Sequence, residues 1–360
     1  MTGLMRRTII AHLDLDEFYV AVERIKDPSL KNKPVVVGGS QTGRGVVSSA
    51  SYEARKYGIH SAMPMYQAMK LCPHLIRVGG KFREYSKYSR SVFNIVQEYS
   101  EFVERTSIDE GYIDLTDSVI KLKRTAIQLA EEIKRRIDKD VGLSVSFGIG
   151  SNKMMAKIAS KHAKPNGILE ILSNKEESFL KPMNVGIIPG VGPKTKERLN
   201  NLGITSIGEL RGLSEKELTS RFGIHGEGLY KRARGIASSK LNSKRERKSI
   251  SNERTFNVNI QTPAGLIPTI TRISMRICEQ MKEKEILARS VSLKLRYENF
   301  ETITRTKTLS KASRNVGVVK SLVEQMIHYN FIPGRSIRLV GVRVSNFEPE
   351  NIQTELNFMR

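Results

Sequence analysis

The chain has 360 residues, a formal net charge of +23 and a sequence pI near 10.0. Its 39% hydrophobic and 27% charged residues fit a globular protein of several domains and exclude disordered and fibrous classes. No apolar run is as long as a membrane span, which excludes a membrane-spanning class. Its 2 cysteines, Cys72 and Cys278, are too few for a disulfide framework or a zinc site, and Asp14 comes too soon for a signal peptide. We therefore expect a cytoplasmic protein whose positive excess binds nucleic acid.

The first half of the chain alternates short strands and helices. Apolar, β-branched runs predict strands over 8–15, 33–38, 45–49 and 143–150. Helical spacing predicts helices over 52–56, 65–71, 82–98, 122–137 and 153–161, the last capped by Ser151 or Asn152. Segments 101–108 and 112–115 predict a strand pair joined by a turn at Asp109, Glu110 and Gly111. These elements predict an α+β layer.

The last third is the most basic part of the chain. Residues 240–348 carry 21 Lys and Arg against 9 Asp and Glu. Strand and helix patterns follow the order β-α-β-β-α-β over 251–260, 270–282, 289–296, 302–309, 316–328 and 337–344, which is the ferredoxin-like order. A dense basic run precedes them and includes Lys244, Arg245, Arg247 and Lys248. We interpret this run as a tether that lies along phosphates; a purely solvated linker is the alternative.

Four carboxylates fall at or next to the ends of predicted strands. Asp14 ends an apolar strand, with Asp16 on the same face two residues on, and Asp109 and Glu110 lie in the predicted hairpin turn. Clustered carboxylates repel one another unless cations bind, and hard oxygen ligands select Mg²⁺ or Mn²⁺. Two such ions transfer phosphoryl groups in polymerases and nucleases. Taken alone, Asp109 and Glu110 are more typical of ordinary turn residues than of metal ligands.

Basic and aromatic side chains complement these carboxylates. Tyr52 and Arg55 are one helical turn apart, and Lys164 lies in a Pro-Gly turn just after a predicted helix. Together they predict a site for triphosphate oxygens, although each alone is typical of a solvated surface. Phe18 and Tyr19 follow Asp14; Phe18 is the better candidate for core packing, whereas a ring at Tyr19 stacked on a sugar leaves no room for a 2′-hydroxyl.

A glycine-rich hairpin follows near the middle of the chain. The segment 188–194 (IPGVGPK) precedes a helix and is followed by LGITSIGEL at 202–210. Gly190 and Gly192 expose backbone N–H groups before a helix that begins at Pro193, and Lys194 adds a positive charge. This helix-hairpin-helix pattern grips a DNA backbone without reading sequence, with an ordinary helical hairpin as the alternative.

Taken together, the motifs resemble those of the Y-family DNA polymerases, most closely the DNA polymerase IV type and its archaeal relatives. The motifs that carry the resemblance are DLDEFY (14–19), SASYEARKYG (49–58), SIDEGY (107–112), SNKMMAKIAS (151–160) and AKPNG (163–167). They occur in the family's order and extend over nearly the whole chain. The resemblance implies a right-hand polymerase with palm, fingers, a helix-hairpin-helix thumb and a ferredoxin-like little finger.

It also implies boundaries for these parts. The palm is expected at 1–17 and 82–170, the fingers at 18–81, the thumb at 171–238, a basic linker at 239–248, the little finger at 249–348 and a tail at 349–360. The chain departs from the family at Gly111, where alanine is commoner, and we expect a glycine to loosen the turn.

The resemblance assigns roles to residues at the matching positions. Asp14, Asp109 and Glu110 are expected to be catalytic and to bind two Mg²⁺ ions, which Mn²⁺ can replace, with the Leu15 carbonyl completing the ligands. Tyr19 is expected to be the steric gate that selects deoxynucleotides. The expected nucleotide contacts are Tyr52, Arg55, Lys164, Phe18, Val46 and Ser48.

The tail contains QTELNF, with Gln353, Leu356 and Phe358 spaced as in peptides that bind a sliding clamp; a frayed terminus is the alternative. The expected function is error-prone translesion synthesis by a monomer that adds dNTPs to primer-template DNA, with no recognisable proofreading domain and no membrane contact. A metal-dependent nuclease or nucleotide cyclase and a non-catalytic DNA-binding scaffold are the alternatives.

Overall fold

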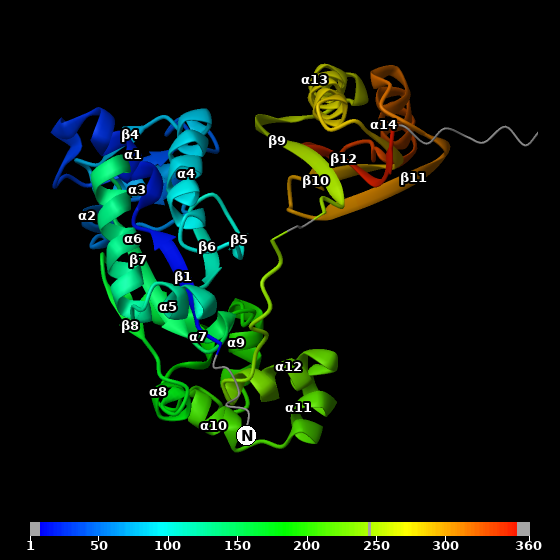
Figure 1. Cartoon of the computed structure of the whole chain (residues 1–360). Coiled ribbons are helices and arrows are strands. Elements are labelled where there is room, and N and C mark those ends of the chain that lie inside the picture. The colour runs from blue at the N-terminus through cyan, green and yellow to red at the C-terminus, as the bar shows by residue number, and fades with distance from the viewer. Residues whose placement is uncertain (1–7, 244–245, 351–360) are drawn as a thin grey trace, which may run out of the picture. The chain divides into compact units, whose positions relative to one another are not determined.

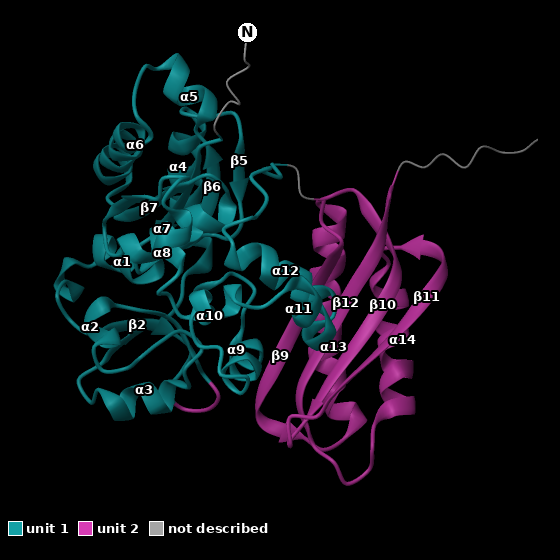
Figure 2. Cartoon of the chain, turned by 90° about the horizontal axis from the view of Figure 1, so that it is seen from below, with its two compact units in different colours: residues 1–41, 45–244 teal, residues 42–44, 245–360 magenta. Residues whose placement is uncertain are grey.

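A computed structural model describes residues 8–243 and 246–350, which form two compact units (Figure 2). The first contains 8–41 and 45–243, and the second contains 42–44 and 246–350. No helix within these described ranges is both long and apolar enough to span a membrane.

A five-stranded sheet forms the centre of the first unit, with strand order β5-β6-β1-β7-β8 (Figure 1). Its strands are β1 (Ile10–Leu15), β5 (Val103–Arg105), β6 (Glu110–Asp114), β7 (Val145–Gly150) and β8 (Ile168–Glu170). The same part of the chain contains the helices α1 (Phe18–Lys26), α4 (Phe82–Gln97), α5 (Thr116–Lys121), α6 (Ala126–Val141) and α7 (Lys153–Ala163). The central strand β1 is antiparallel to both β6 and β7.

The two faces of β1 contact different parts of the unit. Its odd-numbered residues, Ala11, Leu13 and Leu15, join the core that α4 and α6 cover. Its even-numbered residues, His12 and Asp14, face α7, where the His12 ring contacts Ser160. Helix α7 approaches the sheet very closely, since a Cβ at Gly148 of β7 would lie 2.0 Å from the Ser160 nitrogen. His12 and Asp14 thus lie between the sheet and α7.

A smaller sheet, in the order β3-β2-β4, forms the region predicted as fingers. Its elements are η1 (Pro28–Leu30), β2 (Val35–Gly38), β3 (Val47–Ala50), α2 (Tyr52–Arg55), α3 (Met65–Leu71) and β4 (Ile76–Val78). Its buried side chains form a core of their own that includes Val36, Met65 and Cys72. Val35 and Val37 of β2 face the core of the larger sheet instead.

A helical region follows the larger sheet and packs against α7 through Met154, Met155 and Ile158. It contains α8 (Glu176–Leu180), η2 (Val185–Ile187), α9 (Pro193–Asn200), α10 (Ile207–Arg211), α11 (Glu215–Phe222) and α12 (Ile224–Ala233). Capping boxes begin α10 at Ser206 and α11 at Ser214, and Pro193 begins α9. These helices form the helix-hairpin-helix thumb that the sequence predicted.

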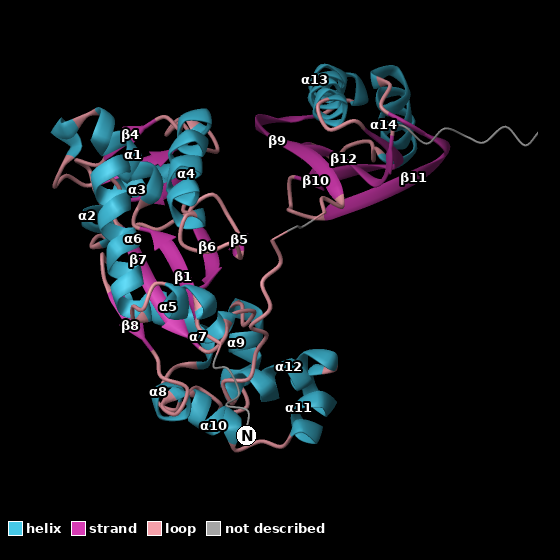
Figure 3. Ribbon diagram, viewed as in Figure 1, coloured by secondary structure: helices cyan, strands magenta, loops and turns pink. Residues whose placement is uncertain are grey.

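The second unit is a four-stranded antiparallel sheet with two helices on one face (Figure 3). Its elements are β9 (Ser249–Ile260), α13 (Pro263–Lys282), β10 (Ile286–Tyr297), β11 (Thr302–Ser313), α14 (Val316–Asn330) and β12 (Ile337–Pro349). The strand order is β11-β10-β12-β9, so each helix connects two strands separated by a third. The predicted β-α-β-β-α-β order is confirmed.

Several local predictions were wrong. The helix predicted over 270–282 begins at Pro263, where Thr262 caps it, and only Val103–Arg105 of the strand predicted over 101–108 forms a strand. The helix predicted over 122–137 begins at Ala126 instead, because Thr125 and Gln128 form a capping box, and the separate helix α5 precedes it. The turn predicted at 109–111 is also misplaced, because Glu110 and Gly111 already belong to β6.

Candidate active site

The carboxylates of Asp14 and Glu110 lie on neighbouring strands. Asp14 of β1 is directly opposite Glu110, the first residue of β6, so both side chains leave the same face of the sheet. The Leu15 amide donates a 2.9 Å hydrogen bond to the Asp109 carbonyl, which brings Asp109 beside the end of β1. Pairing with β1, rather than a hairpin turn, therefore places Glu110.

The turn before β6 is built around Ser107. Its Oγ accepts hydrogen bonds from the backbone N–H groups of Asp109 (3.2 Å) and Glu110 (3.0 Å), and its hydroxyl donates to the Asp109 carboxylate. The amides of Thr106 and Ser107 both donate to the Glu110 carbonyl. Asp109 thus stays in the turn, as predicted, whereas Glu110 does not.

The expectation that Gly111 loosens a turn is also wrong. Gly111 lies inside β6, where a Cβ would be 2.7 Å from Phe93 Cε1 and 2.9 Å from the Glu104 carbonyl oxygen. Arg105 covers the same Phe93 ring, with its Cζ 4.3 Å from the ring centroid. The glycine permits tight packing beneath Glu110.

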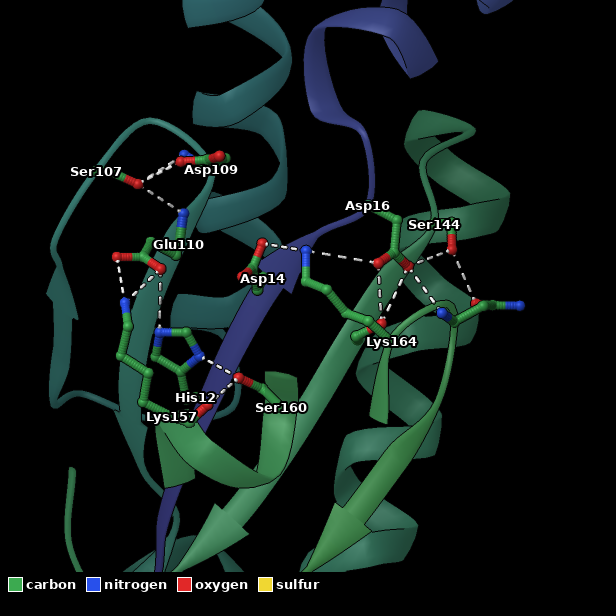
Figure 4. A network of polar contacts seen from close by, with 12 residues as sticks. His12, Asp14, Asp16, Ser107, Asp109, Glu110, Ser144, Lys157, Ser160 and Lys164 are labelled. Carbon is green, nitrogen blue, oxygen red and sulfur yellow. Dashed lines mark hydrogen bonds and ion pairs between the residues drawn. The ribbon is translucent and has the colours of Figure 1, made fainter. Parts of the chain in front are cut away.

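Two lysines pair with these carboxylates. Lys164 Nζ lies 2.6 Å from Asp14 Oδ1, and Lys157 Nζ lies 2.6 Å from Glu110 Oε2 (Figure 4). Burial raises the pKa of Asp14 despite its lysine partner. Lys164 was predicted from the sequence; Lys157, which lies inside the quoted motif SNKMMAKIAS, was not singled out.

His12 completes the surroundings of Glu110 and was also missed. Its buried ring places Nδ1 2.7 Å from Ser160 Oγ and Nε2 3.6 Å from Glu110 Oε2. Burial lowers the pKa of His12, whereas the facing His12 ring and the Lys157 ammonium hold the pKa of Glu110 at about 2. The signal in the sequence was its place two residues before Asp14, on the same strand face.

The donor set fits a hard divalent cation by its chemistry. Asp14, Asp109, Glu110 and the Leu15 carbonyl supply only oxygen atoms, the ligands that Mg²⁺ and Mn²⁺ prefer. Within 8–243 and 246–350, however, no three His, Cys, Asp or Glu residues are grouped closely enough to hold a metal ion. In this geometry lysines, rather than neighbouring carboxylates, surround Asp14 and Glu110.

Asp16 does not share the direction of Asp14, contrary to expectation. Asp16 lies beyond the end of β1 and turns toward Ser144 and Ser146, on the other side of Asp14 from Glu110 (Figure 4). The Tyr52 hydroxyl donates to Asp16 Oδ1 at 3.0 Å, which occupies its only proton. Arg55 lies over the Tyr52 ring, with its Cζ 4.8 Å from the centroid, so the two residues share a face as predicted.

Tyr19 lies at the start of α1 within an aromatic cluster. Its ring stacks on Tyr85, with centroids 4.5 Å apart and planes 19° apart, and contacts Phe82 edge-on at 5.6 Å. Burial, together with the Asp109 charge, raises the pKa of Tyr19. Phe18 is only 3% exposed and packs in the core, so its ring is covered.

Other predicted contacts lie farther from the carboxylates. Val46, before β3, is 46% exposed, and Ser48 is half-buried. Gly190 has φ +92°, which favours glycine, and nothing lies within 4 Å of a Cβ at Gly190 or Gly192. The predicted DNA contacts Lys194, Arg247 and Lys248 are exposed. A cavity of about 250 Å³ runs from Asp14 and Lys157 to the loop that contains Gly190.

Five predicted residues lie outside the described part of the chain. They are Lys244 and Arg245 of the basic run and Gln353, Leu356 and Phe358 of the tail.

Comparison with known proteins gives matches over most of the chain. The impB/mucB/samB family model matches residues 13–161, its C-terminal domain matches 247–356, and a model described as the DNA polymerase-iota thumb domain matches 186–237.

Individual relatives agree with these matches. DNA polymerase IV of Clostridium perfringens strain 13 is 41% identical over 346 residues, which cover 96% of each chain. DNA polymerase IV of Dehalococcoides mccartyi strain CBDB1 is 38% identical over 349 residues, or 97% of this chain and 89% of the relative. The solved structure of a Y-family DNA polymerase chimera has a TM-score of 0.84 and 27% identity, and the match covers 95% of this chain and 99% of that one.

Proposed function

Because this chain belongs to the Y family of DNA polymerases, with DNA polymerase IV enzymes among its relatives, we propose that Asp14, Asp109 and Glu110 form the centre at which it extends a primer. The chain is a DNA-directed DNA polymerase for translesion synthesis, and the expected fold class is confirmed. Relatives of matching length are named as polymerases, which argues against the nuclease, cyclase and scaffold alternatives.

Y-family polymerases are metal-dependent, and we propose that this chain uses two Mg²⁺ ions, or Mn²⁺ in their place. Asp14, Asp109 and Glu110 would hold them, with the Leu15 carbonyl as a further ligand. When bound, such ions activate the primer 3′-hydroxyl and neutralise the triphosphate. The observation that supports this proposal most directly is the cross-strand pairing of Asp14 with Glu110, beside Asp109.

Side chains around the carboxylates supply the nucleotide site. Lys164 and Arg55 offer positive charges for triphosphate oxygens, and the Tyr52 ring supports Arg55. Tyr19, fixed by its stack on Tyr85, would exclude a 2′-hydroxyl. Exposed Val46, with Ser48, would lie over the nascent base pair, whereas buried Phe18 would contribute through its backbone and by supporting Tyr19.

We propose that the remaining predicted contacts serve DNA and a partner protein. The open loop around Gly190 and Gly192, with Lys194, would hold duplex phosphates, as would the basic run 244–248. The tail residues Gln353, Leu356 and Phe358 would bind a sliding clamp. We also propose the predicted palm, fingers, thumb, linker and little-finger boundaries, and a monomer that works in the cytoplasm.

Primer extension on an undamaged and an abasic template, with dNTPs and Mg²⁺, tests the proposal. The wild type is expected to extend past the lesion, and Asp109→Ala to abolish synthesis while still binding primer-template. Asp138→Ala, an exposed carboxylate of α6, is the matched control and should retain activity. An Asp109→Ala variant with normal activity would exclude the assigned centre.

A further inference from the structure

Asp16 is a buried carboxylate that no role assigned above employs. It is 3% exposed, yet four different donor groups lie within hydrogen-bond distance of its two oxygens. The Tyr52 hydroxyl is 3.0 Å from Oδ1, the Ser144 hydroxyl 2.9 Å from Oδ2, and the Ser146 hydroxyl 3.0 and 3.1 Å from the two oxygens. The Asn166 amide is 2.9 Å from Oδ2.

This pattern distinguishes Asp16 from a metal ligand. A carboxylate has about four lone-pair positions, and four donor groups face those of Asp16, with the Ser144 hydroxyl also 3.0 Å from Asn166 Oδ1. Asp14 instead contacts a single ammonium group, that of Lys164, which a metal ion can replace. A buried carboxylate is stable only when it is hydrogen-bonded in this manner, so the arrangement is a specific structural device.

The donors belong to segments far apart in the sequence. Tyr52 begins α2 of the fingers region, and its amide also donates to Glu17 at 2.7 Å. Asn166 lies in the turn after α7 that begins at Lys164, whose Nζ is 3.7 Å from Asp16. The turn and α2 therefore meet at one carboxylate, just beyond the end of β1.

Both segments carry residues of the proposed nucleotide site. Lys164 belongs to the turn, and Arg55 rests on the Tyr52 ring. We propose that Asp16 is a positioning residue for nucleotide binding: its carboxylate fixes Tyr52 and the Lys164 turn at a set separation before the triphosphate arrives. The inference depends on the proposed function, because it assigns Arg55 and Lys164 to the triphosphate. Because α2 and the Lys164 turn are already held in place, nucleotide binding does not have to order them and loses less conformational entropy.

Single-nucleotide incorporation kinetics on full-length protein test this role. Asp16→Asn keeps the shape of the side chain but replaces one acceptor oxygen with an NH₂ group. That NH₂ group cannot accept the hydrogen bonds that the surrounding hydroxyl and amide groups donate. We expect the KM for the incoming dNTP to rise about 10-fold, kcat to change less than about 3-fold, and the Kd for primer-template to stay unchanged. Asp114→Asn, at the far end of β6, is the matched control; its carboxylate caps Thr116, and its KM should equal that of the wild type.

A double-mutant cycle shows whether Asp16 acts through Tyr52. Tyr52→Phe retains the ring beneath Arg55 but removes the hydroxyl, and it should raise KM about 3-fold. The double variant should raise KM by less than the product of the two single effects, because both changes break the same hydrogen bond. Tyr52→Phe leaves the buried carboxylate intact and keeps the test available if Asp16→Asn does not fold.

The outcomes separate this inference from the function on which it depends. An inactive wild type would overturn the proposed function. An active wild type with an unchanged KM in Asp16→Asn and Tyr52→Phe, or with a loss confined to kcat, would overturn the positioning role alone. Fully multiplicative effects on KM would show that Asp16 does not act through Tyr52 and would likewise overturn it.

Discussion

Replacing Lys164 with methionine is expected to tighten divalent-cation binding when no nucleotide is present. Lys164 Nζ lies 2.6 Å from Asp14 Oδ1, and their side chains are 19% and 22% exposed. A cation that binds Asp14 must displace or repel this ammonium group. The substitution removes that competitor and leaves the carboxylates more negative.

The size of the effect follows from the ion pair. Charges 2.6 Å apart attract by about 6 kcal/mol at an effective dielectric constant of about 20, and desolvation offsets most of this. A hydrogen bond to a charged group contributes a net ~1.5–3 kcal/mol. Since about 1.4 kcal/mol is a tenfold change, the Kd for the cation should fall by about 10- to 100-fold.

Calorimetric titration with Mn²⁺, without DNA or nucleotide, measures this change. Lys164→Arg retains the charge and should bind Mn²⁺ like the wild type. Lys139→Met, on the exposed surface of α6, controls for the loss of one positive charge elsewhere. Equal or weaker Mn²⁺ binding by Lys164→Met would refute the view that this lysine competes for Asp14.

Three further predictions follow from other parts of the first unit. Gly111→Ala should lower the free energy of unfolding by about 1–3 kcal/mol in denaturant titrations, because its Cβ would meet Phe93 at 2.7 Å; an unchanged midpoint would contradict this. Tyr19→Ala should raise ribonucleotide relative to deoxynucleotide incorporation by about tenfold or more, and an unchanged ratio would remove Tyr19 as the gate. Hydrogen bonds from Ser206 and Thr205 lower the pKa of Glu209 from 4.5 to about 2. The ionised carboxylate therefore stabilises the folded state fully above pH 4.5, and this contribution to the free energy of unfolding disappears as the pH falls toward 2. The difference in Tm between Glu209→Gln and the wild type should shrink over that interval, and a constant difference would contradict the assignment.

Local patterns in the sequence were sufficient for most elements and for several site residues. Asp14 lies one residue before the end of β1, Tyr52 and Arg55 share a helix face, and Pro193 begins α9, as periodicity and capping chemistry predict. The motif AKPNG singled out Lys164 as a site residue, and the structure places its ammonium group beside Asp14. In each case the signal lay within a few adjacent residues or in a characteristic motif.

What the sequence did not reveal depends on pairing between distant segments. Glu110 resembles a turn residue until β6 pairs with β1, and that register then places it opposite Asp14. Strand alternation placed Asp16 beside Asp14, but alternation ends with the strand, and the hydroxyls of Ser144 and Ser146 redirect the side chain. Gly111 was misjudged for the same reason, since Phe93 comes from a separate helix.

The charge balance of the site follows from the packing of a single helix. Lys157 lies within α7 and Lys164 caps its C-terminal end, so one segment presents two ammonium groups to carboxylates on two strands. That segment reaches the sheet because Gly148 allows α7 to approach β7 closely. A side chain at Gly148 would push both lysines outward together. Pairing of Asp14 and Glu110 with ammonium groups is therefore a property of the helix–sheet contact.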